Sequence, residues 1–358
     1  MKLDDLINQV SEWLRGTGSD SDIVISSRIR LARNFTGIPF PHWANKEQEN
    51  KVIEQVKAGI SQSAHLKNSL FFMLSDLDNI DKQFLVERHL MSHEHATHPD
   101  TKAICLTSNE VISIMINEED HLRIQVMKSG FDLDDAWQII NKLDDDLSNN
   151  FPFAFSKELG YLTACPTNTG TAMRVSIMLH LPVLVMTRQI DRVLDAIAKL
   201  SFTTRGLYGE GTQASGNFFQ ISNQVSLGQK EEEILDKLKG VIRQIIDQEK
   251  TARQALLSKH KHMLEDKIWR SYGTLINAHI ITSQETVELL SMLRLGQDLG
   301  IIKGLERYLI NELFILTQPA HLQQIEKKKL NPQERDIKRA ELIREKLSIK
   351  KINKDNTN

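Results

Sequence analysis

Three acidic residues stand side by side in the segment INEEDHLRIQ, residues 116–125. They are Glu118, Glu119 and Asp120, and Arg123 follows them closely. Adjacent carboxylates repel one another, so such a cluster is either hydrated at the surface or faced by a cation. With a cationic partner, paired carboxylates could hold that group and accept a proton from it. Without one, the segment is an acidic turn in water.

Five arginines before residue 206 could supply positive charge to a site. Each lies at the end of a predicted strand or on its polar face, and Arg28 and Arg205 stand next to serine, threonine or glycine. Arginine binds phosphate oxygens through paired hydrogen bonds, so several arginines together can neutralise a polyphosphate. The alternative is that each is a surface charge with a local partner. The five are Arg28, Arg30, Arg123, Arg174 and Arg205.

Cysteine and histidine motifs give weaker signals. Cys165 lies in TACPTNTGT, a run of small polar residues, and is either a small core residue or part of a functional site. No histidine and aspartate arrangement marks it as a protease nucleophile, and Cys105 is expected in the core. The segment HEHATH, residues 93–98, lacks the H-E-x-x-H pattern because Thr97 stands where the second histidine belongs. We expect a loop there and no metal site.

Alternating apolar and polar residues predict the strands that position these groups. Residues 111–116 and 122–126 both alternate, so the three acids are expected where two strands meet. Residues 173–181 also alternate, which places Arg174 on the polar face of its strand with Ser176, Met178 and His180. Further strands are expected at residues 23–25, at 103–107 and within 217–228.

Helical periodicity appears between and after these strands. Residues 45–62 and 79–91 are predicted to be helical, the second capped by Asn79 or Asp81. Asp132 is the candidate cap of a helix that starts at Leu133, and another helix is expected at about 187–200. From residue 229 the chain is charged and periodic, with no convincing strand. We therefore expect two domains, 1–228 with the sheet and 229–358 all helical.

The composition excludes several classes of protein. A length of 358 residues with 40% hydrophobic and 26% charged residues is typical of globular proteins, and a net charge of -2 gives no basic field for nucleic acid. Two cysteines exclude a disulfide framework and fit a reducing compartment. The first residues carry acids where a signal peptide is apolar, and no apolar stretch is long enough to span a bilayer. A cytoplasmic protein without membrane segments is expected.

Four motifs occur in order between residues 26 and 210. They are SSRIRLARN at 26–34, NEEDHLR at 117–123, CPTNTGTAMR at 165–174 and RGLYGE at 205–210. On these motifs the sequence resembles the phosphagen (guanidino) kinase superfamily, which implies an α+β catalytic domain with an antiparallel sheet flanked by helices. It is most similar to the branch that phosphorylates arginine in proteins. SSRIR begins at Ser26, so the N-terminal helical domain of small-molecule guanidino kinases is not expected, and RDIKRA at 335–340 resembles a phosphoarginine-binding motif.

The resemblance implies a role for each motif residue. Glu119, supported by Glu118, would handle the substrate guanidinium, with Cys165 and Glu210 nearby. Contacts to ATP are implied for Ser26, Ser27, Arg28, Ile29, Arg30, His89, Arg123, Arg174, Val175, Ser176, Ile177, Met178, Arg205, Gly206, Leu207, Tyr208, Gly209 and Glu210. An allosteric phosphoarginine pocket is implied for Arg335, Asp336, Arg339 and Ala340. The sequence departs from the family at Thr169, Ala172 and Met173, where leucine, glycine and leucine are more common.

By the same resemblance the cofactors are ATP and Mg²⁺, and the activity serves the stress response and protein quality control. The implied partners are a heat-shock repressor and misfolded proteins as substrates, a Clp ATPase, a zinc-binding activator and a second copy of the chain. Two alternatives stay open. One is a kinase for free arginine or another small guanidine, and the other is an adaptor that only binds phosphoarginine. Without the family, residues 335–340 would be an exposed helix of mixed charge.

Overall fold

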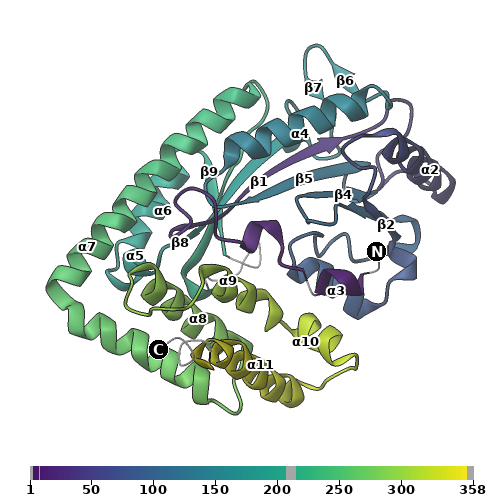
Figure 1. The fold of residues 1–358 in the computed structure, drawn as a ribbon. Helices are drawn as coiled ribbons and strands as arrows, with labels where there is room; N and C mark the ends of the chain where they lie inside the picture. The colour runs from purple at the N-terminus through teal and green to yellow at the C-terminus, as the bar shows by residue number, and fades with distance from the viewer. Residues whose placement is uncertain (1–2, 8, 207–214, 353–358) are drawn as a thin grey trace.

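Strand β1, Val24–Arg33, runs through the middle of a large sheet whose described pairings are all antiparallel. This computed structural model describes residues 3–7, 9–206 and 215–352. The other strands of this sheet are β2 Leu70–Met73, β3 Ala103–Leu106, β4 Ile112–Ile116, β5 Leu122–Ser129, β8 Met173–His180, β9 Phe202–Arg205 and β10 Phe218–Asn223. They lie in the order β2-β3-β4-β5-β1-β8-β10-β9 (Figure 1). A short ribbon of β6 Phe155–Ser156 and β7 Gly160–Tyr161 stands apart.

The central strands have one apolar and one polar face. Ile29 and Leu31 of β1, with Ile124 of β5 beside them, are buried against helix α4, Leu133–Ser148. The alternate residues of the same strands point to the other face, where polar side chains gather. A slip of one residue would exchange the two faces, so burial of the apolar face fixes the register. This register decides which residues can form a site.

The remaining helices before residue 207 mostly agree with the helices predicted from the sequence. They are α1 Asp4–Ile7, α2 Lys46–Gln62, α3 Asn79–Glu87, α5 Pro182–Met186 and α6 Ile190–Lys199, with 3₁₀ turns at Glu12–Leu14, Leu74–Asp76, Pro99–Thr101 and Pro166–Asn168. Asp78 caps α3 and Asp81 completes the capping box from the third helical position, so the prediction of Asn79 or Asp81 as the N-cap is wrong. The helix predicted at 187–200 begins at Ile190, because Arg188 takes a left-handed φ of 56° after α5. Strand β9 was not expected from its short FTTR sequence.

The last part of the chain is helical, as predicted. Helix α7, Glu231–Asn277, is interrupted at His260, and it is followed by α8 Ser283–Asp298, α9 Arg307–Leu316, α10 Pro319–Glu326 and α11 Pro332–Ile352. The predicted α+β fold, an antiparallel sheet flanked by helices and followed by helices alone, is confirmed. Figure 1 shows α8 to α11 gathered beside the sheet, and α7 contacts strands β8 and β10.

Buried arginines join the helices to the sheet region. Arg294 of α8 is fully buried and donates to the carbonyl oxygens of Ser21, at 2.6 Å, and Asp22, at 3.1 Å, just before β1. The division of the chain at residue 228 stays a prediction. Among the described residues, no helix combines the length and apolar character of a membrane span.

Candidate active site

The polar face of the sheet carries all five arginines that the sequence singles out. Directly paired residues of neighbouring strands share a face, as do residues two apart on one strand. By this register Arg30 stands opposite Arg174 across β1 and β8, and Arg28 lies two residues from Arg30. Arg123 reaches the same face from β5, and Arg205 reaches it from β9 through β10. Five cationic side chains therefore converge on one surface.

This convergence makes the site electrostatically unfavourable without an anion. Like charges directly opposite one another on neighbouring strands destabilise a sheet. Burial, followed by the charges of Arg174, Arg123 and Arg205, lowers the pKa of Arg28 to about 10. Burial and the neighbouring arginines lower the pKa of Arg30 as well, and its Nε is buried without a hydrogen-bond partner. A polyphosphate would supply both the missing charge and the missing acceptor.

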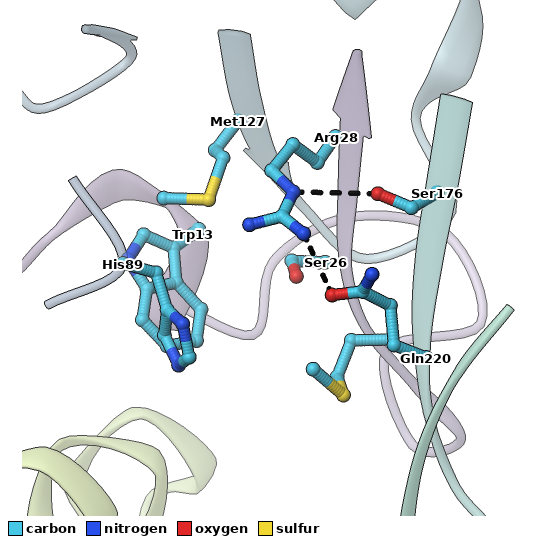
Figure 2. A pocket seen from close by; sticks show the side chains of 8 residues that line it. Trp13, Ser26, Arg28, His89, Met127, Ser176 and Gln220 are labelled. Carbon is cyan, nitrogen blue, oxygen red and sulfur yellow. Dashed lines mark hydrogen bonds between the residues drawn. The ribbon is translucent and has the colours of Figure 1, made fainter. Parts of the chain in front are cut away.

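A pocket opens at one end of the arginine face. Trp13, Arg28, His89 and Gln220 line it, together with Ser26, Met127, Ser176 and Met178. Figure 2 shows the Arg28 guanidinium between Ser176 and Gln220, whose oxygens accept hydrogen bonds at 3.3 and 2.7 Å. The Trp13 and His89 rings pack edge-on, with their centroids 5.3 Å apart. Burial, then the charge of Arg28, lowers the pKa of His89 to about 3, and its Nε2 is buried without a partner. A neutral imidazole and an aromatic ring suit the uncharged part of a nucleotide.

Several residues with an implied ATP contact face away from this pocket. The side chains of Ile29, Val175 and Ile177 lie fully buried on the apolar face. Ser27 is buried there too, where its hydroxyl donates to the carbonyl oxygen of Gly130 at 2.8 Å and accepts from the backbone N–H of Asp132 at 2.9 Å. These side chains support the sheet and the start of α4.

Trp13, Met127 and Gln220 line the pocket but were not singled out from the sequence. The period-2 alternation of NFFQISNQ places Gln220 on the same face as Ser222, which is the one signal that could have found it. Nothing local predicts that Trp13 packs on His89. Leu207, Tyr208, Gly209 and Glu210 lie outside the described residues, and Gly206 is buried.

The acidic cluster forms the turn between β4 and β5, as predicted, and its three carboxylates have different surroundings. Glu118 is almost fully buried, accepts from the Ser92 hydroxyl at 2.7 Å and pairs with Arg123 at 2.6 Å. Burial opposes ionisation, but Arg123, Ser92 and the N–H of Glu119 together lower the pKa of Glu118. Glu118 is therefore an anion that anchors Arg123 between the acids and the arginine face.

Glu119 is the accessible carboxylate of the three. Its side chain is 42% exposed, and Oε2 lies 4.0 Å from Arg123 Nη2. Burial, then the charge of Asp120, raises the pKa of Glu119, and Arg123 offsets part of this rise. A carboxylate with a raised pKa, open on one side, is suited to accept a proton. Glu119 thus connects the acidic turn to the cationic face of the sheet through Arg123.

Asp120 fixes the loop that carries Cys165. It is 3% exposed, and its Oδ1 accepts from Asn34 Nδ2 and from the Ala164 backbone N–H, both at 2.7 Å. Cys165, the next residue, is half-buried with its Sγ 2.9 Å from Thr167 Oγ1. Two hydrogen bonds thus hold the Cys165 loop against the acidic turn, and Asp120 has the role of a positioning residue.

We expect Asp120→Ala to lower the free energy of unfolding by about 1–3 kcal/mol, because the buried Asn34 amide and the partly buried Ala164 N–H would both lose this acceptor. Urea denaturation measures this change. Asp120→Asn is the matched control, since its amide oxygen can still accept one bond, and it should cost less. Equal stability of Asp120→Ala and the unaltered chain would show that these bonds do not hold the loop.

The residues of the implied phosphoarginine pocket divide into two kinds. Arg339 is buried and donates to the carbonyl oxygens of Thr317, at 2.8 Å, and Ile281, at 3.0 Å, and it pairs with Asp336. It therefore ties α11 to the α7–α8 and α9–α10 connections. Arg335, four residues earlier on α11, is only partly buried. Ala340 is buried in the core.

A cationic sheet face beside paired carboxylates is the arrangement of an enzyme that phosphorylates a guanidino group. Residues 51–252 match the family model described as "ATP:guanido phosphotransferase, C-terminal catalytic domain", and the chain belongs to this family. Within it the chain belongs with the protein-arginine kinases. Residues 261–357 match "Protein-arginine kinase McsB C-terminal domain".

Curated relatives agree with this assignment, and solved structures share the fold. The chain is 50% identical over 344 residues to the protein-arginine kinase of Desulforamulus reducens, covering 95% of this chain and 96% of the relative. It is 47% identical to that of Halothermothrix orenii, covering 98% and 100%. The duplicated taurocyamine kinase of Schistosoma mansoni superposes with a TM-score of 0.60 at 26% identity, over 66% of this chain and 34% of that one. Lombricine kinase shares the fold with a TM-score of 0.59, at 24% identity over 67% and 70%.

Proposed function

We propose that this chain transfers the γ-phosphoryl group of ATP to arginine side chains of proteins. The observation that carries the proposal is the position of Glu119, an accessible carboxylate linked through Arg123 to a face with four more arginines. One side of this site is negative and fits a guanidinium, and the other is positive and fits phosphates. The name of the curated relatives supports arginine in proteins as the acceptor.

The mechanism follows from the chemistry of the guanidinium. Its pKa lies far above neutral pH and its lone pairs are delocalised, so it is a poor nucleophile until it loses a proton. Glu119 orients the planar group and takes the proton as the nitrogen attacks the γ phosphorus. The N–P bond forms, the bond from phosphorus to the bridging oxygen breaks, and ADP leaves. Arg28, Arg30 and Arg174 stabilise the charge that spreads over the phosphoryl oxygens. Cys165 lies in the loop that Asp120 holds beside this turn.

ATP fits the described residues through the unpaired Nε of Arg30 and the unpaired Nε2 of His89. Mg²⁺ would be held through the phosphates of ATP, the usual way in which proteins bind this ion in phosphoryl transfer. It would add positive charge on the phosphoryl oxygens.

A comparison of two acceptors, each supplied separately, tests the proposal. The chain is given ATP and Mg²⁺ with either free arginine or an arginine-rich protein, and ADP release is measured. We expect release to depend on the protein and to be far slower with free arginine. The reverse preference would favour a small-molecule guanidino kinase, and no release with either acceptor would favour a phosphoarginine-binding adaptor.

The raised pKa of Glu119 predicts a pH dependence. A base acts only as the carboxylate, so activity is complete above this pKa and is lost as the pH falls through it. We expect the acid limb of kcat/KM to lie above the ~4.3 of an ordinary glutamate. Initial rates across the acid range measure it, and activity recovered at neutral pH excludes denaturation as the cause. An acid limb at or below the ordinary value would contradict this role.

We further propose that the C-terminal helices bind phosphoarginine through Arg335. A phosphoryl group offers three acceptor oxygens, and Arg335 is accessible whereas Arg339 is occupied by backbone carbonyls. We expect Arg335→Ala to weaken binding of free phosphoarginine by at least ~10-fold, as measured by calorimetry. Lys338→Ala is the matched control, since it removes a positive charge from the same helix. Unchanged affinity in Arg335→Ala would refute the pocket.

The biological setting is part of the same proposal. We infer that the protein acts in the cytoplasm as a homodimer, in the stress response and protein quality control. Its substrates would include a heat-shock repressor and misfolded proteins that pass to a Clp ATPase, and a zinc-binding protein would activate it. Support comes from the match to the protein-arginine kinase C-terminal domain and from two cysteines that are both free thiols.

A further inference from the structure

The loop that follows helix α3 reaches both parts of the candidate site. It begins with His89, which lines the pocket in Figure 2, and it continues to Ser92, which contacts the acidic turn. Two strands hold its backbone in place. Gln125 Nε2 of β5 donates to the His89 carbonyl oxygen at 2.8 Å, and Ser113 Oγ of β4 donates to the Leu90 carbonyl oxygen at 2.6 Å. The loop therefore has a fixed path that does not depend on the acids.

The Ser92 hydroxyl accepts one hydrogen bond and donates another. The backbone N–H of His95 donates to Ser92 Oγ at 3.0 Å, so the oxygen is the acceptor there. The single hydroxyl proton is then directed to Glu118 Oε1, 2.7 Å away. The same carboxylate oxygen accepts from Arg123 Nη1 at 2.6 Å. Ser92 and Arg123 thus bind one oxygen of Glu118 together.

Arg123 has two glutamates within reach. Its Nη1 lies 2.6 Å from Glu118 Oε1, whereas its Nη2 lies 4.0 Å from Glu119 Oε2. A closer pair with Glu119 would occupy the carboxylate that has to receive the substrate guanidinium, and it would make that carboxylate a weaker base. A hydroxyl that donates to Glu118 favours its charged form and so favours the pair of Glu118 with Arg123. Glu119 then stays open on the substrate side.

We infer that Ser92 is a positioning residue for phosphoryl transfer, which holds Glu118 on Arg123 and thereby keeps Glu119 free for the substrate guanidinium. The inference rests on the proposed function and adds a residue that acts on the reacting groups through Glu118. It also gives a role to the loop at residues 92–95, where a backbone N–H orients the hydroxyl.

The other charges around Glu118 oppose one another. Burial raises the pKa of Glu118, and Arg123 followed by the Ser92 hydroxyl lowers it most. His95 also faces Glu118, but burial lowers its own pKa to about 4, so the imidazole is neutral near pH 7. The remaining charged groups that interact with Glu118, two positive and two negative, are Arg30, Lys102, Glu119 and Asp120. The Ser92 hydroxyl is thus a neutral donor on which the charge of Glu118 depends.

Ser92→Ala tests the inference through the pH dependence of the rate. Near neutral pH we expect kcat with a protein acceptor to fall about tenfold, the scale of losing one hydrogen bond to a charged group, because Arg123 then pairs with Glu119 in part of the molecules. Glu118 without this donor takes up a proton at a higher pH. The acid limb of kcat should therefore move up by about one pH unit, with activity present above the limb and lost as the pH falls through it. Initial rates across the pH range measure both changes.

Two further serine variants separate positioning from folding. Ser92→Thr keeps the hydroxyl, and because Ser92 is only partly buried the added methyl group can be accommodated, so the rate and the acid limb should both be restored. Ser113→Ala is the matched control. It removes a buried hydroxyl bond to the same loop without touching Glu118, so it should lower the Tm but leave the acid limb where it is in the unaltered chain.

Each other outcome rejects a stated part of the account. An unchanged kcat and acid limb in Ser92→Ala overturn the inference alone. A lower kcat with an unmoved acid limb, or a loss that Ser92→Thr does not restore, also overturns it and leaves Ser92 with a structural role only. An acid limb that moves equally in Ser113→Ala has the same consequence. If the unaltered chain phosphorylates no arginine at any pH, the proposed function and this inference fall together.

Discussion

Glu119→Gln is expected to lower kcat at least ~100-fold, the lower end for removing a positioned base. Glutamine keeps the shape and one acceptor oxygen, but it cannot take a proton from the guanidinium. The phosphate side of the site is untouched, so KM for ATP should stay within about twofold. Steady-state kinetics with a protein acceptor measure both quantities.

Glu54→Gln, on the exposed face of α2, is the matched control and should leave both quantities unchanged. The protein should also stay folded in Glu119→Gln, because this side chain is half exposed. Turnover of Glu119→Gln close to that of the unaltered chain would show that Glu119 is not the base. A raised KM for ATP with normal kcat would instead place Glu119 on the nucleotide side.

Arg30→Met should separate activity from stability. Arg30 faces Arg174 directly, has an unpaired buried Nε and has a lowered pKa, so it is unfavourable in the free protein. Methionine has a similar length and no charge. We expect kcat/KM to fall at least ~100-fold, as for removing one preorganised donor to the transition state. The Tm of the free protein should be unchanged or higher, because the like-charge repulsion is gone.

Thermal denaturation with and without ATP and Mg²⁺ completes this test. The unaltered chain should be stabilised by the nucleotide, and Arg30→Met should lose most of that stabilisation. Arg192→Met, an exposed arginine on α6, is the control and should behave like the unaltered chain. A clear drop in Tm for Arg30→Met alone would show that Arg30 serves the fold rather than the phosphates.

The sequence was sufficient for features that depend on period and local chemistry. Period-2 alternation placed the acids between two strands and put Arg174 on a polar face, and the structure agrees with both. The helical C-terminal part also followed from periodicity. The cap of α3 was predicted at Asn79 or Asp81 instead of Asp78, because DNID offers several capping side chains within four positions.

Contacts between distant segments could not be predicted from the sequence. The three acids look equivalent in NEEDH. In the structure Glu118 binds Ser92 and Arg123, and Asp120 accepts hydrogen bonds from Ala164 and Asn34. That leaves Glu119 accessible. The packing of Trp13 on His89 likewise depends on tertiary structure.

The departure at Ala172 has a structural consequence. Ala172 takes a left-handed φ of 50°, which glycine adopts more readily. The left-handed backbone of the loop before β8 therefore carries some conformational cost for alanine. Its backbone oxygen still accepts from the Ala32 N–H at 3.0 Å, so the loop stays joined to β1.

Mass spectrometry of the acceptor tests the central claim most directly. The chain is incubated with ATP, Mg²⁺ and an arginine-rich protein, kept from acid, and the modified residues are located, with Glu119→Gln in parallel. We expect phosphate on arginine with the unaltered chain and almost none with Glu119→Gln. Phosphate on hydroxyl side chains, no transfer at all, or equal arginine phosphorylation by both proteins would contradict the account.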